Sequence, residues 1–442
     1  MTTTSNSSEP RALAAHPTFA DLVAAFWRIG LLSFGGPAGQ IALMHREIVD
    51  ERRWVEEGAY LRALNLCHLL PGPEAQQLAT WIGWKLHGLR GGLAAGLLFV
   101  IPGAAVMLAL SLLYVAAAGL GWFAALFLGI KAAVLAIVAQ ALIRVGKRAL
   151  GTRFKLALAA LAFVALTVVD APFPLVILLA GLIGAIVGRS RPDWLGAHHA
   201  PSAATGDGPD RRSLARSTLL TVMVWLGIWA APMALIAATL GTGHVLWTIG
   251  AFFSQLAVVT FGGAYAVLAY MAQEAVSGFG WLAAGEMVDG LGLAETTPGP
   301  LIMVTQFVGF LAAFRDAAPF TPVMAGVLGA ALTTWVTFAP CFLWIFACAP
   351  WMDRLERSLA LQSALAAITA VVVGVIANLA LWFALHVLVP EAGTRSWGGW
   401  ITVDWRAAVI AVVAALMLFR FGRGVLTTLA VCAALGLALS LA

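Results

Sequence analysis

Charged residues are scarce in this chain. Only 11% of its 442 residues are Asp, Glu, Lys or Arg, whereas 61% are hydrophobic. Soluble domains carry roughly a quarter of charged residues, so this composition excludes a soluble globular protein. The mean hydropathy is +0.93, and apolar runs long enough to cross a bilayer recur from end to end. The sequence therefore predicts an all-α polytopic membrane protein.

Cysteine is rarer still, with four residues, and no catalytic motif is recognisable. The four cysteines lie in apolar stretches without the spacing of metal ligands, at Cys67, Cys341, Cys348 and Cys432, as is typical of small buried side chains. The sequence has no His/Cys cluster, phosphate-binding loop or nucleophile elbow. We therefore expect no enzyme activity, no metal and no cofactor. The polar segment 1–10 has no basic region followed by an apolar core, so we expect no cleavable signal peptide.

The chain contains an internal duplication. At a constant offset of 227 residues, Phe34-Gly35-Gly36 recurs as Phe261-Gly262-Gly263, and Pro71-Gly72-Pro73 recurs as Pro298-Gly299-Pro300. The same offset relates Met44, Glu47, Trp54 and Gly58 to Met271, Glu274, Trp281 and Gly285. This register holds without gaps from about residue 26 to residue 73, so it predicts one fold unit used twice.

Each half predicts the same series of segments. A segment broken by Gly-Gly (18–49 and 245–276) precedes one broken by Pro-Gly-Pro (57–87 and 282–314), and four less interrupted helices follow. These broken segments either span the membrane or re-enter it. The expected organisation is a polar tail at 1–17, a first transporter repeat at 18–188, a cytoplasmic linker at 189–215, an extra transmembrane helix at 216–240 and a second transporter repeat at 241–442.

Parity and charge predict that the two halves are inverted. One additional crossing between two units of even parity turns the second unit upside down. Lys and Arg crowd segments 144–155 and 189–216, whereas segment 389–404, the equivalent of the first, is nearly free of them. Positive loops are cytoplasmic, so we expect a cytoplasmic N-terminus and a periplasmic C-terminus. The net charge of +5 reports this orientation and does not indicate binding to nucleic acid.

The paired breaks predict an anion site. Proline lacks an N–H and disfavours helical geometry in the residue before it, and glycine permits a sharp turn. Pro73 and Pro300 should therefore open half-helices whose free N–H groups attract an anion; the alternative is a pair of kinks that only shape packing. The predicted substrate-binding residues are Gly72, Pro73, Glu74, Ala75, Gln76, Gln77, Lys131, Thr297, Gly299, Pro300, Leu301, Ile302 and Gln306, together with Ser33, Gly35, Gly36, Thr260, Gly262 and Gly263 around the Gly-Gly breaks.

Ionisable residues inside apolar segments are further candidates, because burying them in a membrane is costly. Lys131 has no other charge near it in sequence; it either neutralises the anion directly or pairs with a structural carboxylate. The candidates for proton coupling or charge compensation are Glu74, Glu295, His68 and Arg46. For Glu74, stabilisation of the helix dipole is an equally good explanation.

These motifs together resemble the chromate ion transporter family. The resemblance rests on residues 34–37, 71–79, 129–131 and 294–300 and covers both halves, as in long two-domain members. It implies export of chromate across the bacterial inner membrane, with sulfate as a chemical look-alike, and resistance to chromate. Leu301 stands where the first half has Glu74, and Gln273 stands where it has Arg46, so the two halves are not expected to play the same role.

The charge of the substrate favours export by alternating access. Moving a dianion across 100 mV is worth about 4.6 kcal/mol, which is roughly three decades of outward accumulation. Two alternatives remain: import of sulfate by proton symport, which pH dependence would reveal, and an anion channel, which rate and saturation would reveal. The expected partners are a small inorganic oxyanion and the lipid bilayer. The oligomeric state is open, and a homodimer is among the states that the sequence allows.

Overall fold

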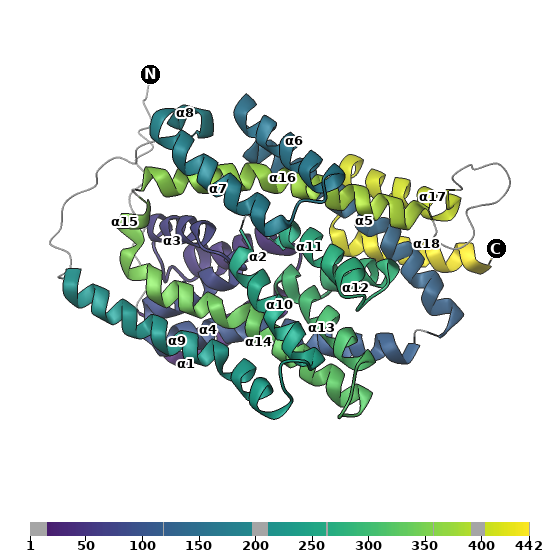
Figure 1. The fold of residues 1–442 in the computed structure, drawn as a ribbon, viewed down its shortest axis with the longest axis horizontal. Coiled ribbons are helices and arrows are strands. Elements are labelled where there is room, and N and C mark those ends of the chain that lie inside the picture. Colours follow the sequence, from purple (N-terminus) through teal and green to yellow (C-terminus); the bar gives the residue numbers. More distant parts are fainter. Residues whose placement is uncertain are drawn as a thin grey trace, which may run out of the picture.

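The fold of the described residues is entirely helical (Figure 1). The computed structural model describes residues 16–117, 119–196, 211–261, 264–356, 358–389 and 403–441. Within these ranges six helices are long and apolar enough to cross a membrane. They are α4 (Glu74–Ala117), α5 (Gly121–Ala149), α7 (Phe173–Ser190), α9 (Arg211–Thr239), α14 (Pro322–Cys348) and α16 (Leu359–Leu388). The prediction of an all-α membrane protein is confirmed.

The first half is interrupted at both predicted breaks. The Gly-Gly segment forms α1 (Phe19–Leu32), α2 (Gly36–Met44) and the π-helix η1 (His45–Glu51), and the Pro-Gly-Pro segment forms α3 (Glu57–Leu69) and the start of α4. α4 consists of two helices that meet at a non-helical kink at His87 and Gly88, which is where the sequence predicted one segment to end and the next helix to follow. After α5 come α6 (Arg153–Val168), α7 and the short α8 (Pro192–Leu195).

The second half repeats this series after α9, which has no counterpart. Its elements are α10 (Val245–Val259), α11 (Ala264–Gln273), η2 (Glu274–Gly278), α12 (Ala284–Thr296), η3 (Leu301–Met303), α13 (Val304–Arg315), α14, η4 (Ala349–Trp351), α15 (Met352–Glu356), α16, α17 (Trp405–Ala415), η5 (Leu416–Arg420) and α18 (Val425–Leu441). Thus α1 matches α10, α3 matches α12, α5 matches α16 and α7 matches α18. The two homologous halves are present as predicted.

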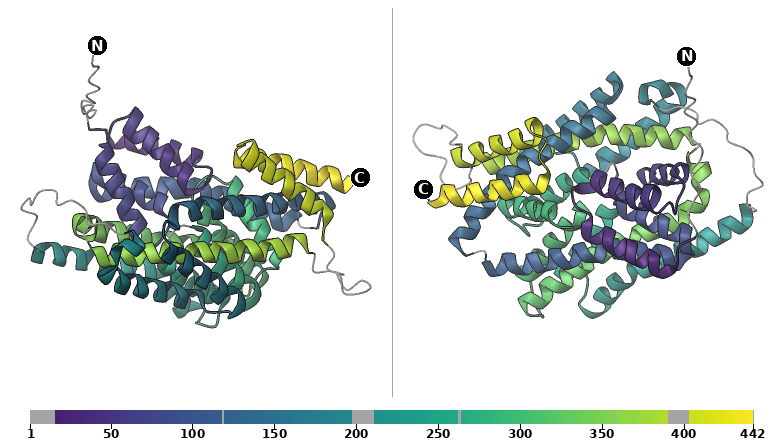
Figure 2. Two further views of the ribbon diagram at one scale, coloured as in Figure 1. Left: turned by 90° about the horizontal axis from the view of Figure 1, so that it is seen from above. Right: turned by 180° about the vertical axis from the view of Figure 1, so that it is seen from behind.

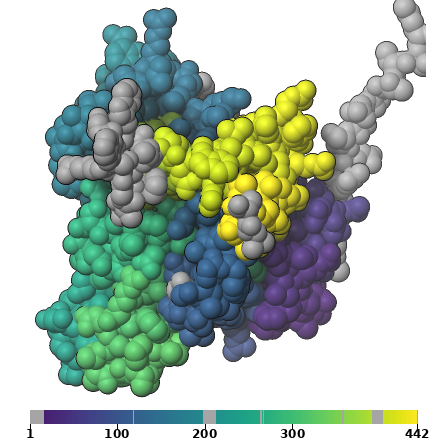
Figure 3. All heavy atoms as spheres, turned by 90° about the vertical axis from the view of Figure 1, so that its right-hand side faces the viewer, coloured from purple at the N-terminus to yellow at the C-terminus, as the bar shows by residue number. Residues whose placement is uncertain are grey.

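The halves interlock. Helix α5 packs against α17 and α18, while its counterpart α16 packs against α6 and α7. In Figures 1 and 2 the α17–α18 pair lies at one end of the long axis, apart from the α6–α7 pair. Figure 3 shows α17 and α18, in yellow, on the face between the N-terminal helices and the green second-half helices. This reciprocal exchange of helices is consistent with two halves that are related by a pseudo-two-fold axis.

Glycines allow the interlocked helices to approach closely. A Cβ at Gly129 of α5 would overlap the Cys432 carbonyl of α18, and one at Gly184 of α7 would overlap the Ser363 carbonyl of α16. Small residues at such crossings let backbones meet, and van der Waals packing then holds helices together in a membrane. The same device therefore joins both reciprocal pairs.

We predict that Gly129→Ala destabilises the protein by about 1–3 kcal/mol, because overpacking a close-fitting core forces shifts of backbone or side chain. The matched control is Gly146→Ala on the same helix, where the added Cβ lies an ordinary 3.6 Å from Val373. This control should be neutral or slightly stabilising, because alanine favours helix over glycine by about 1 kcal/mol. Thermal unfolding of both purified variants in detergent checks the ranking, and equal stability would contradict it.

Candidate functional site

Backbone hydrogen bonds join the two Pro-Gly-Pro breaks across the halves. The N–H of Gly72 donates to the carbonyl of Thr260 at 2.8 Å, and the N–H of Gly299 donates to the carbonyl of Ser33, also at 2.8 Å. Gly72 has a φ of +115° and Gly299 a φ of +95°, values that glycine adopts without strain. Each half therefore supplies a Pro-Gly-Pro turn to the Gly-Gly break of the other half, in a reciprocal pattern.

Two buried glutamines hold these turns in place. The Nε2 atom of Gln40 donates to the Gly299 carbonyl at 2.6 Å and to the Ser33 carbonyl at 3.4 Å. The Nε2 atom of Gln77 donates to the Pro71 carbonyl at 2.7 Å. Because nothing else in a membrane interior satisfies an exposed carbonyl, these side chains stabilise the irregular backbone.

A small cavity lies between the two half-helix starts. It is lined by Pro37, Gln40, Pro73, Glu74, Ala75, Thr260, Pro300, Leu301 and Ile302. Its volume of about 20 Å³ holds roughly one water molecule. The first N–H groups of a helix have no intrahelical partner, and both α4 and the η3–α13 segment begin at this cavity. Their partial positive charges therefore meet at one point.

A second, larger cavity adjoins the first; we call it the basic vestibule. It has a volume of about 410 Å³ and is lined by Gly35, Gly36, Pro37, Ala38, Ile41, His68, Glu74, Ala141, Arg144, Val145, Arg148, Ala149, Lys155, Tyr265, Thr369 and Ile376. Pro37 and Glu74 line both cavities. Glu74 is the one carboxylate among the lining residues, and its Oε2 lies 3.3 Å from Nε2 of His68. Arg144, Arg148 and Lys155 leave the vestibule strongly positive.

The positive charge of the vestibule is not repeated in the other half. At the offset of 238 that relates Pro102 to Pro340, Arg144 corresponds to Trp382 and Arg148 to His386. Trp382 lines a different cavity of about 270 Å³, whose lining residues include Asp170 and Gln273 but no lysine, arginine or histidine. The scaffold is nearly symmetric, whereas its electrostatic field is not.

The structure brings many of the predicted site residues together. Pro73, Glu74, Ala75, Thr260, Pro300, Leu301 and Ile302 line the small cavity, and Gly35, Gly36, His68 and Glu74 line the vestibule. Gly72, Gly299 and Gln77 form the turns beside them. Gln76 is fully buried, and neither polar atom of its side chain has a hydrogen-bond partner among the described residues. Gly262 and Gly263 lie outside the described residues.

The predicted hydroxyl donors act differently from expectation. The hydroxyls of Ser33, Thr260 and Thr297 donate to the carbonyl four residues earlier in their own helices. Such intrahelical bonds are the usual arrangement for Ser and Thr in membrane helices. Ser33 and Thr260 serve the site instead through their backbone carbonyls, which accept the two cross-half hydrogen bonds.

Lys131 pairs with a carboxylate, which was the structural alternative. Its Nζ lies 3.3 Å from Oδ1 of Asp289, and Oδ2 of Asp289 accepts a hydrogen bond from the Tyr114 hydroxyl at 2.8 Å. Lys131 lines neither the small cavity nor the vestibule. Sequence reasoning missed Asp289 and Tyr114, although an aspartate within a broken membrane segment was an available signal.

Two other candidates, Glu295 and Arg46, also lie away from the small cavity. Glu295 accepts a hydrogen bond from the Tyr265 hydroxyl at 2.7 Å. Arg46 is 59% exposed and pairs with Glu51, and it lines neither cavity of the candidate site.

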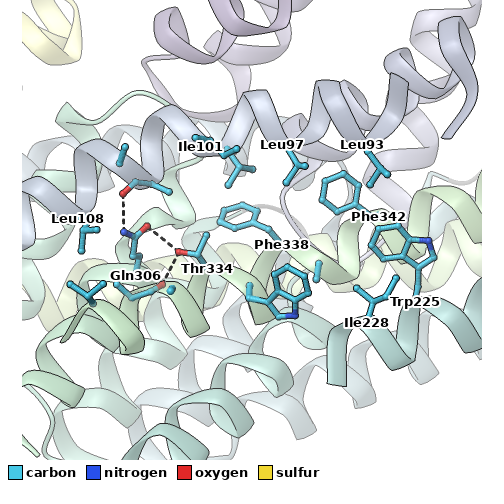
Figure 4. Close-up of a pocket in the computed structure, with 18 residues that line it drawn as sticks. Leu93, Leu97, Ile101, Leu108, Trp225, Ile228, Gln306, Thr334, Phe338 and Phe342 are labelled. Atoms are coloured by element: carbon cyan, nitrogen blue, oxygen red, sulfur yellow. Dashed lines mark hydrogen bonds between the residues drawn. The ribbon is translucent and has the colours of Figure 1, made fainter. Parts of the chain in front are cut away.

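Gln306 borders an apolar cavity that does not suit an anion. This cavity of about 500 Å³ lies between α4, α9 and α14 and is lined mainly by aliphatic and aromatic side chains, among them Trp225, Phe338 and Phe342 (Figure 4). Gln306 and Thr334 are its polar lining residues; they bond to each other, and Gln306 also donates to the Ala104 carbonyl. An oxyanion would find no charged side chain among these lining residues.

Comparison with known proteins agrees with the two-half architecture. The sequence profile of the family described as "Chromate transporter" matches residues 20–185 and 247–437, one region in each half. The chain belongs to the chromate transporter family.

Relatives within this family are similar over most of their length. A chromate transport protein of Pseudomonas aeruginosa is 33% identical over 366 residues, which are 81% of this chain and 79% of the relative. A chromate transport protein of Cupriavidus metallidurans is 28% identical over 404 residues, 91% of this chain and 88% of the relative. A probable chromate transport protein of Synechococcus elongatus is 28% identical over 369 residues, 83% of this chain and 85% of the relative. No solved structure matches the chain.

We predict that Gln40→Met lowers the free energy of unfolding by about 1–3 kcal/mol, because the buried Gly299 carbonyl loses its side-chain donor. Thr80→Val is the matched control, since the buried Thr80 hydroxyl donates only within its own helix, to the Gln76 carbonyl. Thermal unfolding in detergent should show a clear loss for the first variant and little change for the second. Equal losses of stability in the two variants would contradict the prediction, because the hydrogen bond between the halves would then contribute no more than one within a helix.

Proposed function

We propose that the protein exports chromate from the cytoplasm across the bacterial inner membrane by alternating access, and so confers resistance to chromate. The observation that carries this proposal is the small cavity between two half-helix starts, set at the end of the basic vestibule. The names of the relatives, chromate transport proteins, favour chromate as the substrate.

The chemistry of the joined cavities suits a small anion. Helix starts carry about half a positive charge each, and two of them line the small cavity. The vestibule adds Arg144, Arg148 and Lys155, and its one carboxylate, Glu74, is offset by His68.

The asymmetry of charge supports export. Arg144, Arg148 and Lys155 belong to the basic connection that the positive-inside rule places in the cytoplasm. They therefore concentrate an anion at the cytoplasmic side, and the membrane potential then drives a dianion outwards. The equivalent positions in the other half carry Trp382 and His386, so the exit retains the anion less strongly. This orientation puts the N-terminus in the cytoplasm and the C-terminus in the periplasm.

The size of the small cavity supports a mechanism with moving parts. A tetrahedral oxyanion is larger than the single water that fits there, so the halves must separate for the ion to reach both helix starts. An inverted repeat provides two equivalent arrangements of the same parts, one open to each side. A pore that stays open would not need this rearrangement, so the closed cavity favours a transporter over a channel.

We predict saturable uptake of chromate into proteoliposomes towards a positive interior, without any pH gradient. A dianion gains about 4.6 kcal/mol across 100 mV, so the imposed potential alone should drive roughly a thousandfold accumulation. Chromium-51 uptake measures the flux. A strict need for a proton gradient would indicate symport through groups such as Glu74, Glu295 or His68. Flux that does not saturate would indicate a channel, and no flux would contradict the choice of chromate.

Competition by sulfate in the same assay measures the selectivity of the site for chromate over sulfate.

We predict that Arg144→Gln combined with Arg148→Gln raises the KM for transport about tenfold, equivalent to ~1.4 kcal/mol, with a smaller effect on the maximal rate. The two guanidinium groups attract the ion into the vestibule without holding it in the small cavity. The matched control is Arg46→Gln, which removes an exposed arginine that pairs with Glu51. The wild-type KM should also rise with ionic strength, because salt screens exposed charges. Equal effects of both changes would contradict this role for the vestibule.

A further inference from the structure

The two halves differ in which side is open. On the vestibule side, Ile41 and Thr369 line the open space and are half-buried. Their repeat equivalents, Leu268 and Lys131, line no matching vestibule: Leu268 is fully buried, and Lys131, itself half-buried, is ion-paired with Asp289. The vestibule is therefore present in one orientation and shut in the other.

The closed side results from close packing of α12 on α5. A Cβ at Gly292 would overlap the Ile130 side chain, and one at Gly285 would lie 3.1 Å from Nζ of Lys131. On the open side the equivalent helices, α3 and α16, face the vestibule through His68 and Thr369. The contact between α3 and α16 is thus less extensive than the contact between α12 and α5, and the vestibule lies beside it.

A polar cluster joins the closed helices. The Lys131 ammonium of α5 pairs with the Asp289 carboxylate of α12, and the Tyr114 hydroxyl of α4 donates to the same carboxylate. The Asp289 side chain is only 6% exposed. Removing one partner of a buried ion pair is costly, because the other charge remains buried and uncompensated.

The other half cannot form this cluster. At offset 238 the equivalents of Lys131 and Tyr114 are Thr369 and Met352, and at offset 227 the equivalent of Asp289 is Arg62. The three groups that hold α4, α5 and α12 together therefore occur on one side of the molecule only. Because this cluster has no counterpart in the other half, it is suited to a role that differs between the two sides of the membrane.

We propose that Lys131, Asp289 and Tyr114 form the outer gate of the transporter. Opening the gate separates α12 from α5 and breaks the ion pair, while α3 closes on α16 and shuts the vestibule. The inference rests on the proposed alternating access, and it assigns Lys131 to closing the exit side.

Thiol labelling at one repeat-related pair of positions tests the gate. In a background with Cys67, Cys341, Cys348 and Cys432 replaced by alanine, Ile41→Cys reports the vestibule side and Leu268→Cys reports the closed side. A membrane-impermeant maleimide is applied to spheroplasts or to inside-out vesicles. In the otherwise unchanged protein Ile41→Cys should react from the cytoplasmic side, whereas Leu268→Cys should react slowly from either side.

Neutralising the gate should reverse this pattern. With Asp289→Asn or Lys131→Met, labelling of Leu268→Cys from the periplasmic side should rise about tenfold or more, and labelling of Ile41→Cys should fall. Tyr114→Phe removes one hydrogen bond and should produce a smaller change in the same direction. This milder variant keeps the test decisive where a charge variant fails to fold.

The matched control is Glu286→Gln. Glu286 also lies on α12 and is ion-paired, but its partner is Arg315, on α13, at 2.6 Å, and α5 takes no part. Its neutralisation should leave both labelling rates unchanged. The charge-reversed double variant Lys131→Asp with Asp289→Lys should restore slow labelling of Leu268→Cys.

Unchanged labelling of Leu268→Cys in the Tyr114→Phe and Asp289→Asn backgrounds, in protein that reaches the membrane, would overturn the gate. An equal rise in the Glu286→Gln background would overturn it as well, because it would show general loosening of α12. The assay contains no chromate, so it separates two failures. If the wild type transports no chromate but labelling is reversed in the gate variants, the choice of substrate is rejected. If the wild type transports chromate but labelling is unchanged in the gate variants, only the gate is rejected.

Discussion

An irregular turn inside a membrane must find hydrogen-bond partners within the protein, because the lipid provides none. In this fold each Pro-Gly-Pro turn finds its partner in the opposite half. The Gly72 N–H bonds to the Thr260 carbonyl, and the Gly299 N–H bonds to the Ser33 carbonyl. One half alone would leave both breaks unsatisfied, so the constraint accounts for the pairing of two halves, for their interlocking and for the position of the candidate site. Proline and glycine are tolerated here because the other half completes their hydrogen bonding.

The duplicated scaffold carries side chains that differ between the halves. Arg144 faces the vestibule where the other half has Trp382, and Glu74 lines the site where it has Leu301. Equivalent backbone with different charge gives a molecule that can move by symmetric rearrangement and still attract an anion unequally on its two sides. In this account the scaffold provides the motion, the substituted side chains set how strongly each side attracts the anion, and the membrane potential sets the direction.

Much of the fold was predictable because backbone chemistry is local. A fixed register of Gly-Gly and Pro-Gly-Pro located the breaks, and the structure gives Gly35, Gly72 and Gly299 positive φ values. The side-chain partners were not predictable in this way. The Asp289 that pairs with Lys131 comes from the other half of the chain, and nothing local to Lys131 indicates it. Arg144 and Arg148 were predicted only as orientation signals, because their place beside the breaks depends on how α5 packs.

The central claim is that an oxyanion binds where the two half-helix starts meet. The most direct measurement is a crystal structure with bound chromate, using anomalous scattering at the chromium absorption edge to locate the metal. The account predicts a single strong peak between the N–H groups at Glu74 and Ala75 and those at Leu301 and Ile302, with the small cavity enlarged around it. A strong peak elsewhere, for example beside Lys131 or among the apolar side chains around Trp225, with none between the helix starts, would contradict it.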